Sequence, residues 1–161
     1  VIGSDISIEM MDLARGEYGE DRFQGFVQAD ITATPFARES FACVVVLALM
    51  HRLHKSLRRD VLSEVASLSN RFVIMSYSAD SFSQRIKQRI LKVLRPSHIP
   101  APSSVPLVDI VREVHSHGFN LLRISPIAYF FSAKVILLME KNTKPGEKEP
   151  RTYPSTGDIP L

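Results

Sequence analysis

The sequence predicts an α/β fold in which a doubly wound, mostly parallel sheet carries helices on both faces. Short apolar runs rich in β-branched residues alternate with segments of helical periodicity, the pattern of such sheets. The run at residues 41–47 is continuously apolar, as a strand buried on both faces requires. Two runs near the C-terminal end, at residues 121–127 and 133–140, have no helix between them. Because a parallel crossover needs about a dozen residues or more, these last two strands are expected to pair antiparallel.

Composition is that of an ordinary globular domain. The chain has 161 residues, 20 basic and 17 acidic, with 45% hydrophobic and 23% charged side chains, a size that fits one domain with a real core. A single cysteine, Cys43, excludes a disulfide framework and a cysteine-built zinc site. The longest apolar run, residues 41–50, is about half of what a membrane-spanning helix needs. No apolar leader with a basic start is visible, so we expect a cytoplasmic domain without a membrane span.

Each element follows from a local signal. In the first half, Ser7 can cap a helix that Gly16 ends. The expected elements there are strands at residues 1–5, 23–29, 41–47 and 72–75, with helices at residues 8–15 and 51–68.

The second half begins with a helix from Ser81 or Ser83 to Leu94. Four prolines then predict an irregular loop over residues 96–106. A helix from Leu107 to His117 is closed by Gly118, and the two antiparallel strands follow. Residues 1–141 therefore form the domain. Residues 142–161 have few apolar groups and are expected to be a disordered tail.

Two aspartates stand where ligands bind in such sheets, at the carboxyl ends of strands. Asp5 follows the first strand and Asp30 follows the next. A carboxylate in this position can accept hydrogen bonds from both hydroxyls of a ribose. A lone aspartate here is more often a turn or cap residue, but two at adjacent strand ends favour a nucleotide-binding role.

At these residues the sequence resembles a family. Residues 3–11, GSDISIEMM, followed by LAR at 13–15, are similar to the second motif of class I S-adenosylmethionine (SAM)-dependent methyltransferases of the type 11-like group. QADI at 28–31, with the following PF and SF pairs, resembles the next motif, and LMHRL at 49–53 resembles the segment after the fourth strand. The resemblance implies a Rossmann-like fold with SAM as cofactor.

The resemblance also implies roles for particular residues. Asp5 would bind the ribose hydroxyls, and Asp30 would accept from the adenine amino group. Four apolar residues would line the cofactor: Ile6 beside the adenine, Met10 touching it, Ile31 through its backbone amide, and Leu47 beneath it. For these four, ordinary core packing is an equally good interpretation.

The chain departs from the family at its start. The family's first strand and its glycine-rich loop are missing, and Ala42 stands where the family usually has aspartate. The family's sheet order is 3-2-1-4-5-7-6, so the missing strand is the central one and its two neighbours would keep unpaired edges. The sequence, which begins at Val1, is thus expected to be the C-terminal part of a longer protein. Alternatively, the second and fourth strands pair directly, or another chain supplies the strand.

His51 is the candidate general base, because an imidazole titrates near neutral pH. A helix-start histidine bonded to backbone is the commoner situation. His54 lies one turn on, but no carboxylate partner is evident, so no metal is expected. Arg85, Lys87 and Arg89 belong to a basic helix that either contacts an anionic acceptor or faces solvent. No aromatic residues interleave with these charges, which disfavours nucleic acid as a partner.

The leading hypothesis is SAM-dependent methyl transfer to a small-molecule or lipid-like acceptor, by a domain present here without its glycine-rich loop. The alternative is a catalytically silent module of the same fold that serves binding or assembly. An acidic residue followed by G-x-G-x-G upstream would favour the enzyme. A genuine start at Val1 would favour the silent module.

Overall fold

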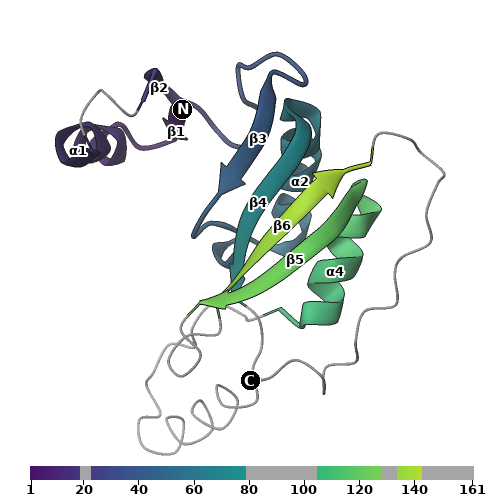
Figure 1. Ribbon diagram of the computed structural model, residues 1–161. Coiled ribbons are helices and arrows are strands. Elements are labelled where there is room, and N and C mark those ends of the chain that lie inside the picture. Colours follow the sequence, from purple (N-terminus) through teal and green to yellow (C-terminus); the bar gives the residue numbers. More distant parts are fainter. Residues whose placement is uncertain (19–22, 79–104, 128–133, 143–161) are drawn as a thin grey trace, which may run out of the picture.

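The computed structural model describes residues 1–18, 23–78, 105–127 and 134–142. Its strands form two separate sheets (Figure 1). One sheet has two strands in the order β1-β2, and the other has four in the order β3-β4-β6-β5. The α/β architecture predicted from the sequence is thus present, divided between a small and a large part.

The small part is a β1–α1–β2 unit. Strand β1 (Ile2–Asp5) pairs in parallel with β2 (Gly25–Gln28), and α1 (Ile8–Tyr18) connects them. The glycine in β1 is required by close packing, because a Cβ on Gly3 would lie 2.8 Å from two ring atoms of Phe26. The Arg15 guanidinium of α1 lies over the same ring, 5.0 Å from its centroid.

The large part contains the core. Strands β3 (Phe41–Val46) and β4 (Ser69–Ser78) run parallel, joined by the short 3-10 helix η2 (Met50–Arg52) and by α2 (Lys55–Leu68). After α4 (Leu107–Ser116) come two further strands, which end the described chain. They are β5 (Phe119–Ile127) and β6 (Lys134–Lys141).

The antiparallel C-terminal pair is confirmed. Strand β6 inserts between β4 and β5 and runs antiparallel to both. Gly118 has φ +80°, the left-handed conformation that the sequence predicted for the end of α4.

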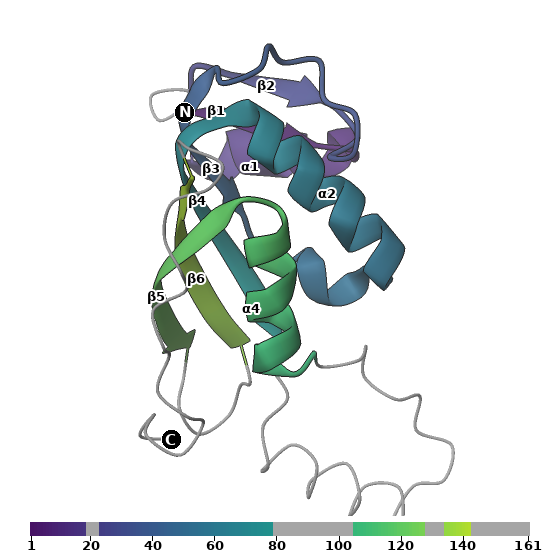
Figure 2. The same cartoon turned by 90° about the vertical axis from the view of Figure 1, so that its right-hand side faces the viewer.

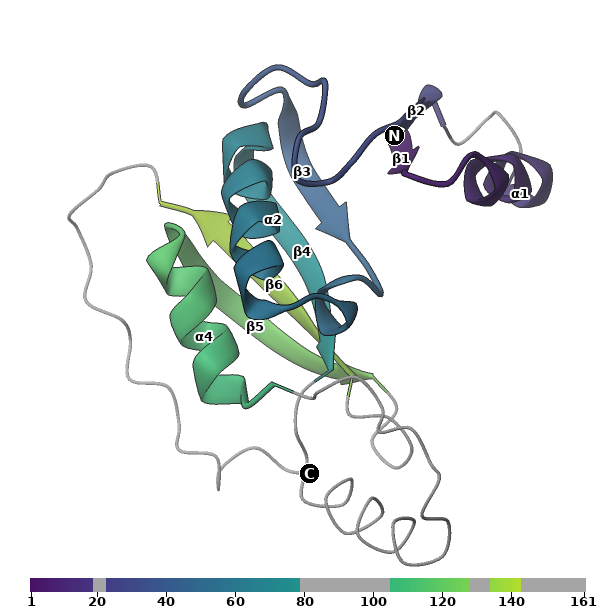
Figure 3. The same cartoon turned by 180° about the vertical axis from the view of Figure 1, so that it is seen from behind.

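Helices α2 and α4 cover the same face of the four-stranded sheet (Figures 2 and 3). Their apolar stripes and the inward side chains of the strands form one buried cluster, which includes Val61, Ile110 and Phe119, each fully buried. No helix of the described residues covers the opposite face, where Val45 is 55% exposed. The helix that the sequence predicts up to Leu94 lies outside the described residues, so helices on both faces of this sheet stay a prediction.

The strand order matches the one that the resemblance implies, with a gap. If β1, β2, β3, β4, β5 and β6 are taken as the family's strands 2, 3, 4, 5, 6 and 7, the order 3-2-1-4-5-7-6 is reproduced except for strand 1. The interruption lies between β1 and β3, which belong to different sheets. Direct pairing of these two strands, one of the sequence alternatives, is therefore wrong.

Several element boundaries differ from those predicted. Gly16 does not end the first helix, since α1 continues to Tyr18. Helix α2 begins at Lys55, not at His51, because residues 50–52 form a separate 3-10 turn. The strand expected at residues 72–75 extends over Ser69–Ser78. Three predictions fall outside the described residues. They are the helix up to Leu94, the proline-rich loop as far as residue 104, and the disordered tail from residue 143 onward.

Strand β4 and the entry to α4 are joined by a backbone hydrogen bond. The Val105 N–H donates to the Ser78 carbonyl over 3.1 Å. Val105 is itself buried in the core cluster. Ser78 and Val105 are therefore neighbours in space although 26 residues separate them in the chain.

Candidate functional site

Asp5 ends β1 and is exposed. Its Oδ1 accepts a hydrogen bond from the Ser7 N–H at 2.9 Å, and the Ser7 hydroxyl oxygen in turn accepts from the Met10 N–H at 3.2 Å. The turn and cap chemistry predicted for these residues is thus present. No described residue donates to Oδ2 of Asp5, so this oxygen can accept from a ligand.

Asp30 lies at the same end of the small sheet. Asp5 pairs with Gln28 in the parallel register, two residues before Asp30, and the Ala29 N–H donates to the Asp5 carbonyl at 3.1 Å. Oδ1 of Asp30 accepts from the Thr32 N–H at 2.9 Å and from the Thr32 hydroxyl at 2.8 Å. These two bonds hold the pKa of Asp30 below its usual value, so it is ionised near neutral pH.

The apolar candidates divide into two groups. Ile6, Met10 and Leu47 are 66%, 56% and 58% exposed, so ordinary core packing does not describe them. Ile31 instead packs against the core cluster of the large sheet. The three exposed side chains are therefore accessible to a ligand.

Leu47 begins a constrained loop that leaves β3. Ala48 has φ +57°, a left-handed conformation that a residue with a Cβ adopts at a cost. Its N–H donates to the Ser76 hydroxyl on β4 over 2.7 Å. Met50 is fully buried and anchors the next turn. The loop is therefore fixed at the carboxyl ends of β3 and β4.

His51 follows in this loop, half-buried within η2. Its surroundings lower the pKa of His51, first through desolvation and then through the positive charges of Arg52 and Lys134. A lowered pKa keeps the imidazole neutral near pH 7, the state in which it can accept a proton. Tyr77 on β4 is buried in the core cluster of the same sheet.

The candidate residues thus lie on both sides of the gap. Asp5, Ile6 and Asp30 belong to the small part, whereas Leu47 and His51 belong to the large one. A hydrogen-bond clasp joins the two. Oε1 of Glu64 on α2 accepts from the Thr34 N–H at 3.0 Å and from the Thr34 hydroxyl at 2.6 Å.

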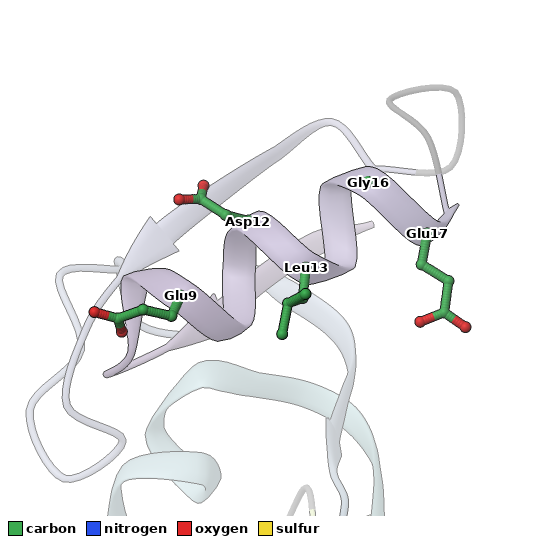
Figure 4. A pocket seen from close by; sticks show the side chains of 5 residues that line it. All are labelled: Glu9, Asp12, Leu13, Gly16 and Glu17. Atoms are coloured by element: carbon green, nitrogen blue, oxygen red, sulfur yellow. The ribbon is translucent and has the colours of Figure 1, made fainter.

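A shallow, open hollow lies elsewhere, along α1 (Figure 4). Its lining consists of Glu9, Asp12, Leu13, Gly16 and Glu17, all on that helix. None of these is a sequence-predicted site residue. Such an open surface on one helix does not enclose a ligand as binding clefts do.

The described residues hold no group of three or more His, Cys, Asp or Glu side chains that could bind a metal ion. Among the described helices, none has both the length and the apolar character needed to cross a membrane.

Known proteins give an independent view of these features. The sequence profile of a family described as a methyltransferase domain matches residues 1–71, the segment that carries all the predicted site residues. No curated protein matches the sequence.

Solved structures match a larger share of the chain. The magnesium protoporphyrin IX methyltransferase of Synechocystis, with bound S-adenosylhomocysteine (SAH), superposes with a TM-score of 0.73 at 20% identity, covering 88% of this chain and 64% of its own. A SAM-dependent methyltransferase of Methanosarcina mazei gives a TM-score of 0.69 at 12% identity, covering 89% of this chain and 82% of its own.

The chain has the class I methyltransferase fold. A third methyltransferase structure, from Haloferax volcanii in complex with the Trm112 activator, gives a TM-score of 0.65 at 14% identity and covers 88% and 71% of the two chains. The present chain spans 64% of the length of the Synechocystis enzyme. This methyltransferase fold is thus matched over most of residues 1–161, while part of that relative's length has no counterpart here.

Local sequence patterns did not reveal two features of the site region. Ser76 fixes Ala48 from the neighbouring strand, and Arg58 contacts the Leu53 carbonyl at the end of η2 over 3.2 Å. Nothing in the sequence around Ser76 or Arg58 indicates that these side chains make such contacts. The left-handed conformation of Ala48 could not be predicted either, because alanine rarely adopts it.

Proposed function

We propose that the protein transfers a methyl group from SAM to a small-molecule acceptor. One observation carries the proposal. Two carboxylates, Asp5 and Asp30, end neighbouring parallel strands of a class I methyltransferase sheet, at the end where ligands bind in this architecture. The family match over residues 1–71 covers both.

The residues of the small part suit the adenosine half of SAM. Each aspartate uses Oδ1 within its own turn and has no described donor to Oδ2, which leaves an acceptor for a ligand hydroxyl or amino group. In this proposal Asp5 accepts from the ribose hydroxyls and Asp30 from the adenine amino group. Ile6 and Met10, both exposed, cover the adenine, and the backbone amide of Ile31 lies beside it.

The residues of the large part serve the reacting end. When bound, SAM supplies an electrophilic methyl group, so orientation of the acceptor accounts for much of the catalysis. Leu47 supports the cofactor from the loop after β3. His51 takes a proton from an acceptor that must lose one, since its lowered pKa keeps it neutral.

We also propose that the space between β1 and β3 accepts a parallel strand that residues 1–161 do not contain. Strands β1 and β3 are each the edge strand of their own sheet, and unpaired edges invite pairing. The exposed Val45 on β3 belongs to the uncovered sheet face that a following helix would bury. The backbone amides that surround the methionine half of SAM would follow this strand.

Isothermal titration calorimetry tests the proposal on two proteins, residues 1–161 alone and a version extended at the N-terminus by the encoded sequence. We expect SAM to bind the extended protein, and to bind residues 1–161 weakly or not at all. Micromolar affinity of residues 1–161 would overturn the role of the added strand.

The Asp5→Ala variant of the extended protein tests the site itself. The lost hydrogen bonds should weaken SAM binding by about 1.5–3 kcal/mol. Asp12→Ala is the matched control, because Asp12 is an exposed carboxylate of α1 that pairs with Arg15 at 2.8 Å. Unchanged affinity in Asp5→Ala would reduce Asp5 to a turn residue. SAM binding without methyl transfer to any acceptor in a small-molecule panel would favour a silent binding module.

A further inference from the structure

A buried ion pair joins the two helices that cover the large sheet. Arg58 on α2 donates from Nε to Oε2 of Glu113 on α4 over 3.1 Å. The two side chains are 9% and 7% exposed. Removing two charges from water costs several kcal/mol per ion, so a pair in this position is weak evidence of a purely stabilising purpose.

The same guanidinium makes a second contact. Its Nη1 donates to the backbone carbonyl of Leu53 over 3.2 Å. Leu53 is the residue that closes η2, and its own N–H donates to the Met50 carbonyl at 3.4 Å. Glu113 therefore orients a guanidinium whose other branch holds the end of the turn that contains His51.

This contact completes the attachment of the loop from residue 47 to residue 53. At its start, the Ala48 N–H is held by Ser76 on β4. In its middle, Met50 is fully buried. At its end, Arg58 holds the carbonyl of Leu53. A functional loop needs such support, because side chains must be kept within about 0.5 Å of productive geometry.

The pair is only partly satisfied by its surroundings. Oε1 of Glu113 has no hydrogen-bond partner among the described residues, and neither has the buried Tyr77 hydroxyl. Burial and the nearby Glu113 charge raise the pKa of Tyr77, so the phenol stays neutral. In a bidentate pair both carboxylate oxygens accept from the guanidinium, whereas here Oε2 alone does so. Here one guanidinium branch is directed to the loop.

We propose that Arg58, oriented by Glu113, is a positioning residue for the loop that carries Leu47 and His51. The proposal rests on the proposed function, since it assigns the purpose of that loop. Arg58 itself touches no reacting group. It fixes the carbonyl end of η2, and through η2 the direction and the partly desolvated environment of the His51 imidazole.

The test uses a double variant in the full-length protein. Arg58→Met combined with Glu113→Leu removes both buried charges, so neither is left unpaired, and such replacements are often neutral or stabilising. Arg58→Lys keeps the charge but lacks the planar fork that reaches both partners. Arg59→Met is the matched control on the adjacent, exposed position of the same helix.

Amide hydrogen exchange reads the loop directly. Loss of the charged hydrogen bond should speed exchange of the Arg52 and Leu53 amides on the order of 10-fold or more in the double variant and in Arg58→Lys. The Ser69 amide, which bonds to the Val65 carbonyl at the end of α2, should not change. Equal acceleration at Ser69 and in the loop would mean a global structural role and would overturn the proposal.

Two further measurements separate positioning from stability. An NMR titration should show the pKa of His51 moving up toward its ordinary value in the double variant, as the imidazole gains water. Steady-state kinetics should show kcat falling about 10-fold with the KM for SAM unchanged. A double variant with wild-type exchange, pKa and kcat would overturn the proposal. If the wild-type protein transfers no methyl group, the proposed function fails, while the exchange and titration results still decide whether Arg58 holds the loop.

Discussion

The β1–α1–β2 unit and the four-stranded sheet are built by different means. Fully buried side chains form the core of the large sheet. Each of its strands and helices contributes at least one, except β3, whose most buried residue, Val46, is 5% exposed. In the small unit, Met11 is the buried apolar residue among those described. The small unit is instead held by local turns, by the Phe23–Phe26 ring contact at 4.7 Å and by the clasp from Thr34 to Glu64.

The two parts therefore differ in role, since the large sheet contains most of the stabilising core and the small unit contains the residues proposed to bind the adenosine. The residues proposed to hold the adenosine lie in the part with the least buried surface, whereas the proposed base lies in the part with the most. Binding segments are commonly drawn from the less stable regions of a fold. The small unit is therefore expected to depend on neighbours, a central strand and a ligand among them, more than the large sheet does.

The largest effect should follow from emptying the large core. Phe119 is fully buried at the start of β5, so Phe119→Ala should lower the free energy of unfolding by about 3–5 kcal/mol. Urea denaturation followed by circular dichroism measures it. Leu122→Ala on the same strand is the control, because Leu122 is 50% exposed. Similar losses in both variants would contradict the assignment of the core to this sheet.

A smaller effect should follow from overpacking the small unit. Gly3→Ala introduces a Cβ 2.8 Å from the Phe26 ring, which should cost about 1–3 kcal/mol locally. Hydrogen exchange should rise at the β1 and β2 amides and remain unchanged in β4 and β6. Gly16→Ala is the control, since nothing lies within 4 Å of that added Cβ. Acceleration that spreads to β4 would show that the two parts unfold together.

The thiol of Cys43 can report on the open edge strand β3. Cys43 is exposed, and partial desolvation raises its pKa, so the thiolate fraction near neutral pH is below that of a free cysteine. Alkylation of residues 1–161 should therefore go to completion, more slowly than for glutathione, with a rate that rises with pH. In the N-terminally extended protein the rate should fall further. Equal rates in the two proteins would argue against a segment that covers this part of β3.

The smallest effect concerns a single exposed carboxylate. Thr32→Val removes the hydroxyl donor to Asp30 and leaves the backbone bond, the larger cause of the lowered pKa, so the pKa of Asp30 should rise part of the way toward its ordinary value. Because the pKa of Asp30 is lower in the folded state, this bond stabilises the protein at pH values above the unfolded-state pKa. The stabilisation is lost as the pH falls through the folded-state pKa. NMR titration of the Asp30 carboxyl carbon measures the shift. An unchanged pKa would mean that the backbone bond alone sets it.

The sequence predicted those features that short-range patterns encode. Alternating strands and helices, the short connection that makes the C-terminal pair antiparallel and the left-handed Gly118 can each be predicted from a local stretch of sequence. The adjacency of Asp5 and Asp30 followed because parallel strands joined by a helix end at the same edge.

The features that were missed depend on distant partners. Residues 50–52 form a separate turn because Met50 is drawn into the core, a tertiary effect that overrides the helical pattern of the following residues. Arg58 belongs to a basic stretch typical of a solvent-exposed helix face, yet its side chain is buried against a carboxylate 55 positions away in the sequence. The close approach of Gly3 to Phe26 likewise joins residues from two strands.

The hydrogen bond between Val105 and Ser78 has a consequence for the history and the engineering of this protein. Because the two residues already meet, whatever connects them closes a loop whose entropic cost grows slowly, by about 0.6 kcal/mol for each doubling of length. Insertions, deletions or exchanges between Ser78 and Val105 should therefore change the stability of the fold little. Descendants of one ancestral domain could diversify at this junction while inheriting the sheet unchanged, and a grafted segment could be tried there with β4 and α4 left intact.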